Sequence, residues 1–491
     1  MNNILRSYVD KFNKDDNECY KQDIENTSAA SWMAENVPLI QIPDKTIEEI
    51  YYFRWWTFRK HVKNTEDGYV LTEFLAPVAW GGKHNTIIAP VGHHVSEGKW
   101  LKCGDVILKD YLKFWLEEKS NTYWYSTWLL HSVYELCSHI NDFSFGMENL
   151  YLLIRYYEKF EADHLTGSGL FKTIGDFDAM EFSISGVPIE LDREMFGLRP
   201  TLNSYMAAGA LAISRFAEKA GKADLSREYY DKYVSIKDKM TEILWDGTFY
   251  KAIHTDDLDN PSIADIPPSR NVKELVGYIP WAFGLAPAGF EEAFEELKLT
   301  DGFKSEYGLT TAERRHPRYL YPVGHECLWN GYIWPFATSQ TLSAVNNLLR
   351  NYNQNVMTKD DFYDILYTYA ESQHFITPDG RRICWIDEVK DPETNEWSSR
   401  KVLEEGGWDK AKGGFERGKD YNHSTFCDIV LGGLLGIASK DGEVSAEPMI
   451  PDDWDYFRVD NLWICGKCYE IVYDKNGDRY GLGKGITILP R

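Results

Sequence analysis

The sequence is short of positive charge and lacks any long apolar run. It has 53 Lys and Arg residues against 76 Asp and Glu residues, a formal net charge of −23. Contacts from Lys and Arg supply most of the affinity for nucleic acids and for anionic lipid surfaces, so we expect neither partner. No stretch approaches the roughly 18 consecutive apolar residues of a membrane-spanning helix. The N-terminal residues show no signal peptide pattern, and we therefore expect a cytoplasmic protein.

Cysteine is also sparse, with 8 residues in a chain of 491. That number does not indicate a disulfide framework, and Cys465 and Cys468 form an isolated CxxC pair with no neighbouring histidine. His94 and Glu97 lie three residues apart, but this pair is better interpreted as a polar wall of a binding site than as metal ligands. The glycine cluster at 481–485 neither follows a strand nor opens a helix, unlike a nucleotide-binding loop. We therefore expect no metal and no cofactor.

Aromatic residues are abundant, with 17 Trp, 31 Tyr and 24 Phe. Flat aromatic rings stack on the apolar faces of sugars while their polar edges stay hydrated, and they also fill large helical cores. The composition alone is consistent with both uses.

Helical periodicity dominates the first 440 residues. Apolar residues recur at spacings of three and four, typical of amphipathic helices. The segment 220–226 contains a glycine stop followed by Asp and Ser, which predicts a short connection between antiparallel helices. The predicted helices fall at 107–115, 128–137, 150–160, 202–217, 230–244, 338–349, 362–369 and 429–437.

Four long loops rich in Trp, Gly, Pro and charged residues separate these helices, at 74–98, 173–200, 309–332 and 378–420. Such loops in a compact protein are usually functional. We predict an all-α toroid over residues 1–440, with its loops meeting above a central cavity. Residues 441–491 differ, because they show alternating strand patterns and an Asn-Gly turn, and they predict a small β-appendage.

Three loop segments carry residues suited to cleaving a glycosidic bond. Such hydrolysis needs one protonated carboxyl and one ionised carboxylate whose environments separate their pKa values. The segment 175–186 places Asp176, Asp178 and Glu181 among apolar residues, and 385–397 contains Glu388. The third segment, 329–336, is rich in Trp and leads into a helix.

Taken in this order, the segments resemble the glycoside hydrolases of families 63 and 37, which include mannosylglycerate hydrolases, processing α-glucosidases and trehalases. The matching positions are Trp329, Gly331, Trp334, Pro335, Glu388, Pro392 and the segment 421–426. The resemblance implies an (α/α)6 barrel and hydrolysis with inversion of configuration. It also implies that Asp178 is the general acid and Glu388 the general base. Asp176 and Glu181 remain alternative acids, and Glu404 and Glu405 alternative bases.

The expected substrate is a small carbohydrate, cleaved in the exo mode. Where the family has a Trp-Asp pair near the innermost sugar, this chain has Arg54 and Trp55, and an arginine there could bind a carboxylate of the substrate. The candidate substrate-binding residues are Arg54, Trp55, Trp56, Trp80, His93, His94, Trp329, Trp334, Trp385, Asn422 and His423.

Two other functions fit the same pattern. A sugar epimerase or isomerase on this toroid would use the histidines for proton transfer, and a non-catalytic carbohydrate-binding protein would keep only the aromatic site. The sequence leaves open the sugar, the anomeric linkage, the substrate length and the oligomeric state.

Overall fold

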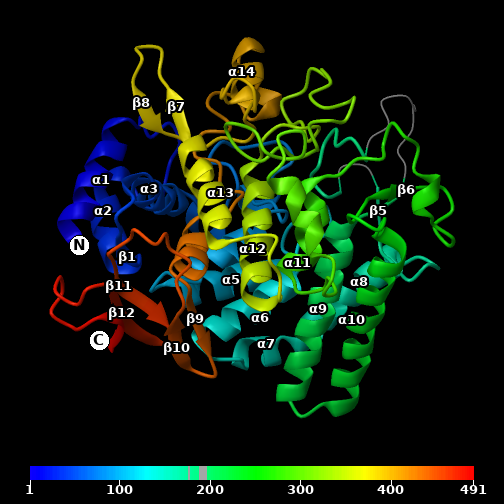
Figure 1. Cartoon of the computed structure of the whole chain (residues 1–491), viewed down its shortest axis with the longest axis horizontal. Coiled ribbons are helices and arrows are strands. Elements are labelled where there is room, and N and C mark those ends of the chain that lie inside the picture. The colour runs from blue at the N-terminus through cyan, green and yellow to red at the C-terminus, as the bar shows by residue number, and fades with distance from the viewer. Residues whose placement is uncertain (175–176, 187–195) are drawn as a thin grey trace.

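The computed structural model describes residues 1–174, 177–186 and 196–491. The chain is mainly helical, with small sheets at its periphery (Figure 1). The α-helices are α1 Asn2–Lys14, α2 Asn26–Asn36, α3 Lys45–His61, α4 Val91–Gly98, α5 Gly104–Leu116, α6 Leu129–Ile140, α7 Ser144–Glu148, α8 Leu150–His164, α9 Pro200–Lys219, α10 Ala223–Leu244, α11 Ile279–Ala282, α12 Pro335–Asn351, α13 Lys359–Ser372 and α14 Ser398–Glu405.

Helices α9 and α10 form the clearest hairpin of the molecule. The helix α9 ends at Lys219, Gly221 follows with φ +71°, and α10 begins at Ala223. A left-handed residue directly after a helix is the usual glycine stop, because glycine has no Cβ to clash there. The predicted short connection is confirmed, and α9 buries residues on nearly all sides while α10 covers it from outside.

A four-stranded antiparallel sheet stands beside the helices, at the lower left of Figure 1. Its strand order is β1-β11-β12-β13, so a strand from the N-terminal region completes the predicted C-terminal β-structure. The predicted Asn-Gly turn lies between β12 and β13, with Gly477 at φ +87°. The strands are β1 Leu39–Gln41, β11 Tyr456–Ile464, β12 Lys467–Asp474 and β13 Gly485–Pro490.

The remaining strands form small ribbons. Three are hairpins and one is a three-stranded sheet of order β4-β5-β6. Their bounds are β2 Val62–Thr65, β3 Gly68–Leu71, β4 Lys172–Ile174, β5 Phe196–Leu198, β6 Ile253–His254, β7 His374–Ile376, β8 Arg382–Cys384, β9 Ile437–Lys440 and β10 Glu443–Ala446.

The helix predicted over 429–437 is only partly correct. A π-helix runs over Ile429–Leu434, and Ile437 already begins β9. Gly436 adopts φ +65°, and a Cβ there would lie 1.9 Å from the carbonyl oxygen of Glu447. The apolar spacing suggested a longer helix, but the close approach of the following strand ends it at this glycine.

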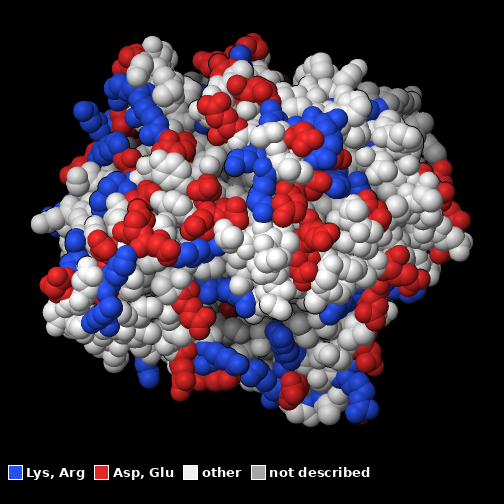
Figure 2. All heavy atoms as spheres, viewed as in Figure 1, with Lys and Arg blue, Asp and Glu red and all other residues white. Residues whose placement is uncertain are grey.

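One continuous hydrophobic core connects the helices with the four-stranded sheet, from Leu5 to Ile471. The β7–β8 hairpin, α14 and the loop before α12 lie together at the top of Figure 1. Figure 2 shows acidic and basic side chains interspersed on one face, without a large basic surface. Among the described residues, no helix is both long and apolar enough to cross a membrane.

We predict that Gly92→Ala destabilises the fold. A Cβ at this α4 position would lie 1.8 Å from Trp128 Cε2, and the rigid indole is buried. Overpacking of this kind costs about 1–3 kcal/mol, measurable by urea unfolding. Gly432→Ala is the matched control, because a Cβ there would lie 3.7 Å from Asp428 Oδ1, an ordinary van der Waals contact. Equal stability of the Gly92→Ala variant and the parent would contradict the predicted clash.

Candidate active site

Glu388 and Arg417 form a buried ion pair at the centre of the candidate site. Glu388 follows β8 by four residues and is 3% exposed, and its carboxylate accepts a hydrogen bond from the Arg417 guanidinium. The Cys327 thiol donates to the other carboxylate oxygen at 3.1 Å. Burial raises the pKa of Glu388, while the positive charge of Arg417 opposes this shift. Glu388 is therefore a stronger base than an exposed glutamate, and Arg417 stabilises its ionised form.

Arg417 is itself enclosed by aromatic rings. Its guanidinium carbon lies 5.2 Å from the ring centroid of Phe74 and 5.4 Å from that of Trp80. Both distances are within the range of cation–π interactions. The predicted site residue Trp80 thus contacts the partner of Glu388.

A second buried carboxyl, Glu73, lies close to this ion pair. Glu73 follows β3, and Tyr421 donates a hydrogen bond to its side chain. Burial, together with the nearby charges of Glu388 and Glu181, raises the pKa of Glu73 to about 8. Two carboxyl groups with different environments therefore occupy one site, one paired with arginine and the other with a phenol.

Glu181 approaches the same cluster from a strained loop. Its negative charge raises the pKa of both Glu73 and Cys327, and it is partly exposed. The flanking residues Ala179 and Phe182 have φ values of 54° and 57°. Non-glycine residues rarely adopt this left-handed conformation, and such strain concentrates at functional sites. The backbone is held in place where Trp329 N–H donates to the Glu181 carbonyl at 3.0 Å.

Aromatic rings line the segment next to these acids. Trp329 and Trp334 stack with their ring centroids 4.5 Å apart and their planes at 21°. Trp334 lies 6.0 Å from the His423 ring, which is 3.7 Å from Tyr421. The buried Nε1 of Trp329 has no hydrogen-bond partner within the described part of the chain. A substrate hydroxyl could accept this hydrogen bond.

Asp178, the predicted general acid, is surrounded by polar side chains. Its side chain is 0% exposed. It accepts hydrogen bonds from Ser126 Oγ at 2.6 Å and from Thr201, and Arg199 Nη1 lies 3.7 Å away. Both carboxylate oxygens are thus bound by the protein, an arrangement typical of a residue that positions a loop.

Arg54 and His94 bind the segment that contains Asn422 and His423. Arg54 donates to Tyr369, Gln373 and Ser424, including a 2.6 Å bond to the carbonyl of Ser424. His94 contacts the Asn422 carbonyl at 2.7 Å and the Tyr111 hydroxyl at 2.9 Å. Backbone N–H of Asn422 donates to the Glu73 carbonyl at 3.0 Å. These residues therefore fix the position of the segment that contains Asn422 and His423.

The other predicted binding residues are distributed around the site and the core. His93 lies 2.8 Å from Thr425 Oγ1 and packs against Trp128 and Phe336. Trp55 and Trp56 are buried in α3, where Trp56 Nε1 donates to Asn13 at 2.8 Å.

Trp385 is 6% exposed and packs against Arg400. The guanidinium carbon of Arg400 lies 4.9 Å from the centroid of the Trp385 ring. Among the alternative catalytic residues, Asp176 lies outside the described residues. Glu404 and Glu405 are exposed at the end of α14. Glu181 is thus the alternative that the structure brings close to Glu73.

Sequence reasoning missed Glu73, Cys327 and Arg417. The last two lie inside predicted functional loops, and Glu73 directly precedes another. The loops were recognisable from their composition. The individual partners were not, because a lone Glu, Cys or Arg has no distinguishing spacing.

The site agrees with the comparisons to known proteins. The sequence model of the mannosylglycerate hydrolase MGH1-like glycoside hydrolase domain matches residues 83–424. The chain belongs to this glycoside hydrolase family. The resemblance to mannosylglycerate hydrolase-type enzymes is thereby confirmed. No curated protein sequence matches the chain.

Solved structures add to this assignment. A structure described as a sialidase is 34% identical with a TM-score of 0.88, over 100% of this chain and 43% of that chain. The present chain thus spans less than half the length of that protein. The family 78 rhamnosidase of Bacillus sp. GL1 shares the fold at 12% identity, with a TM-score of 0.56 over 90% of this chain and 40% of that one.

We predict that Glu73 makes the stability of this glycoside hydrolase fall with rising pH. Its pKa is raised from 4.5 to about 8 on folding, so the folded state holds a proton that the unfolded state releases. The contribution is fully present below pH 4.5 and is lost as pH rises through about 8.

Urea unfolding of the parent and of Glu73→Gln, from pH 5 to pH 9, measures this effect. The variant keeps an acceptor for Tyr421 but has no titrating group at position 73. As the pH rises, we therefore expect the unfolding free energy of the variant to increase relative to that of the parent. An identical pH dependence of the two proteins would exclude the raised pKa.

Proposed function

We propose that this protein is an exo-acting, inverting glycosidase for a small oligosaccharide or glycoside. The proposed architecture is an (α/α)6 toroid of residues 1–440 with a β-appendage of residues 441–491. The observation that carries the proposal is the cluster of Glu388, Glu181 and Glu73 beside the stacked Trp329 and Trp334. The family membership favours hydrolysis over epimerisation or simple binding. The burial of Glu388 and Glu73 favours attack at a chain end.

Glu388 is the proposed general base. An inverting glycosidase needs a carboxylate that takes a proton from water on the face opposite the leaving group. Burial raises the basicity of Glu388, and the Arg417 ion pair keeps its ionised form populated. The Glu388 N–H donates to Asp387 Oδ1 at 2.8 Å, which orients the residue from behind.

For the general acid we favour Glu181 over Asp178. Both oxygens of Asp178 are bound by neighbouring side chains, and its side chain is 0% exposed. A proton donor must reach the glycosidic oxygen, and Glu181 combines partial exposure with proximity to Glu73 and Cys327. In this proposal Asp178 positions the strained loop that presents Glu181.

We further propose that the innermost sugar is neutral. Three carboxyl groups, those of Glu388, Glu73 and Glu181, lie near Arg417, which is already paired with Glu388. Arg54 makes four hydrogen bonds to protein groups, so its guanidinium is engaged. A carboxylate on the bound sugar would thus find the guanidinium groups of Arg417 and Arg54 already bound to protein partners.

A panel of aryl glycosides tests the function. We expect Glu388→Gln and Glu181→Gln to lose about 10³-fold or more in kcat, equivalent to about 4 kcal/mol of transition-state stabilisation. The Glu181→Gln loss should shrink for a nitrophenyl leaving group of low pKa, because such a group leaves without protonation. Asp178→Asn should retain more activity while unfolding at lower temperature. Proton NMR of the first-formed anomer reads out inversion.

The panel should contain neutral glycosides, a uronide, a glyceryl glycoside and a sialoside, the last because of the relative described as a sialidase. Hydrolysis of the uronide or the sialoside alone would contradict the neutral subsite. Full activity of both glutamine variants would exclude the proposed acid and base. A loss confined to Asp178→Asn would return the acid role to Asp178.

Arg417→Gln should move the acidic limb of the kcat/KM profile to higher pH. Removing the guanidinium removes the interaction that lowers the pKa of Glu388, so the base becomes ionised only at higher pH. Arg155→Gln is the control, since Arg155 pairs with Glu118 at the surface. An unchanged acidic limb in Arg417→Gln would show that Glu388 does not control it.

A further inference from the structure

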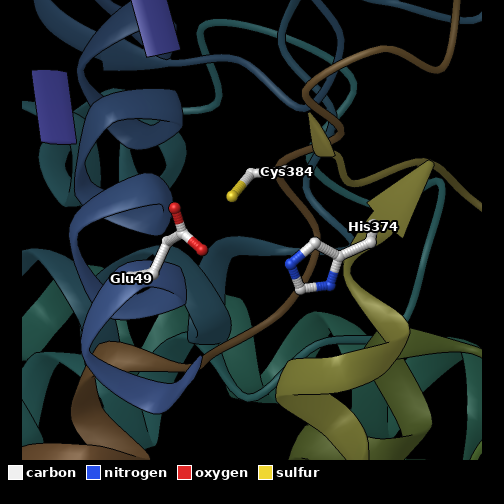
Figure 3. A group of neighbouring side chains, drawn as sticks. All are labelled: Glu49, His374 and Cys384. Carbon is white, nitrogen blue, oxygen red and sulfur yellow. The ribbon is translucent and has the colours of Figure 1, made fainter. Parts of the chain in front are cut away.

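Outside the carboxylate cluster, one helix and one hairpin bring three potential metal ligands together. We propose that Glu49, His374 and Cys384 form a binding site for a zinc ion. Figure 3 shows the carboxylate of Glu49 on α3 facing the imidazole of His374 on β7 and the thiol of Cys384 on β8. One ligand atom from each residue lies within 4.8 Å of the other two.

The β7–β8 hairpin itself sets the His-Cys pair. His374 and Cys384 are direct partners in the antiparallel register. Side chains of such partners project from the same face of the ribbon, with Cβ atoms about 4.5–5.5 Å apart. That spacing suits two ligands of one tetrahedral ion, with metal–nitrogen bonds of about 2.0 Å and metal–sulfur bonds of about 2.3 Å.

The ring orientation of His374 suits metal binding. Its Nδ1 lies 2.9 Å from the backbone carbonyl oxygen of Glu371, and a bond there leaves the Nε2 lone pair for a metal. Arg382 Nη2 also lies 3.0 Å from Nδ1, but it pairs with the Glu371 carboxylate at 2.6 Å.

The ligand set selects zinc among common ions. Thiolate and imidazole are poor ligands for calcium and magnesium, whereas one sulfur, one nitrogen and one carboxylate oxygen suit zinc, with water in a fourth position. On binding, the Cys384 thiol transfers its proton to solvent and a zinc–sulfur bond forms, with no redox change.

A cation already occupies part of this site. The Lys11 ammonium pairs with Glu49, and the Lys11 side chain is 47% exposed while that of Glu49 is 18% exposed. A largely exposed lysine can move into solvent when a divalent ion replaces it. Lys11 is therefore a competitor for the metal, which provides a direct test.

A metal here would fasten the base of the β7–β8 hairpin to α3. Cys384 precedes Glu388 by four residues, so the ion would also restrict the segment that carries the general base. This consequence rests on the role proposed for Glu388, whereas metal binding itself does not.

Elemental analysis after zinc loading and dialysis, together with cobalt titration, tests the site. We expect one zinc per chain and, with cobalt, a thiolate-to-metal charge-transfer band. Cys384→Ser should lose the band and at least tenfold in zinc affinity, and Lys11→Met should bind zinc more tightly than the parent. Circular dichroism and thermal unfolding without metal establish that each variant is folded.

Two controls separate this site from other ligands. Cys103→Ser removes a thiol outside the cluster, and Asp67→Asn alters the other candidate group, Glu66, Asp67 and His84, which contains no sulfur. Both should bind zinc as the parent does. No zinc retained by the parent, or equal affinity in the parent and Cys384→Ser, would overturn the proposal. Glycosidase activity is a separate readout, so failure of the metal site and failure of the proposed catalysis are distinguishable.

Discussion

The buried ion pair between Glu388 and Arg417 constrains the arrangement of the whole site. Transferring either charge into a protein interior alone is costly, and removing one partner of such a pair typically costs about 3–5 kcal/mol. Three long loops meet here: 378–420 contains the pair itself, 74–98 supplies Phe74 and Trp80, and 309–332 supplies Cys327. The loops can therefore close over the site only in an arrangement that keeps the two charges together.

Beneath this pair, a second buried network fixes the segment that leads into the π-helix. Glu97 accepts hydrogen bonds from three consecutive backbone N–H groups, those of Phe426, Cys427 and Asp428, at 2.6–2.9 Å. A carboxylate at unpaired N–H groups is a favourable helix-terminus interaction. Together with His94, which contacts the Asn422 carbonyl, Glu97 positions this segment, and this role gives the dense polar cluster in α4 a structural explanation.

Much of the fold was predictable, because amphipathic helices have apolar residues at regular spacings of three and four in the sequence. The α9–α10 hairpin was recognisable from its apolar stripes and its glycine stop. The π-helix at Ile429–Leu434 and the pairing of β1 with β11 were not. Both depend on segments far apart in the chain, and local periodicity contains no information about them.

The candidate site, like the fold, was predictable from the sequence only in part. The acidic and tryptophan-rich segments around Glu181, Trp329 and Glu388 were evident in the sequence, and they already indicated sugar chemistry. The sequence could not show that Glu73 lies in their midst, or that Asp178 is bound by Ser126 and Thr201.

The sequence by itself therefore determined the helical architecture and the long polar loops, and its resemblance to a known family indicated a class of reaction. Tertiary structure decided which carboxyls face each other, which are held by protein partners, and which cysteine lies beside a histidine. The physical reason is that pKa values, ion pairing and metal coordination depend on distances of a few ångströms between residues separated in the sequence, by 29 positions for Glu388 and Arg417 and by 348 for Glu73 and Tyr421.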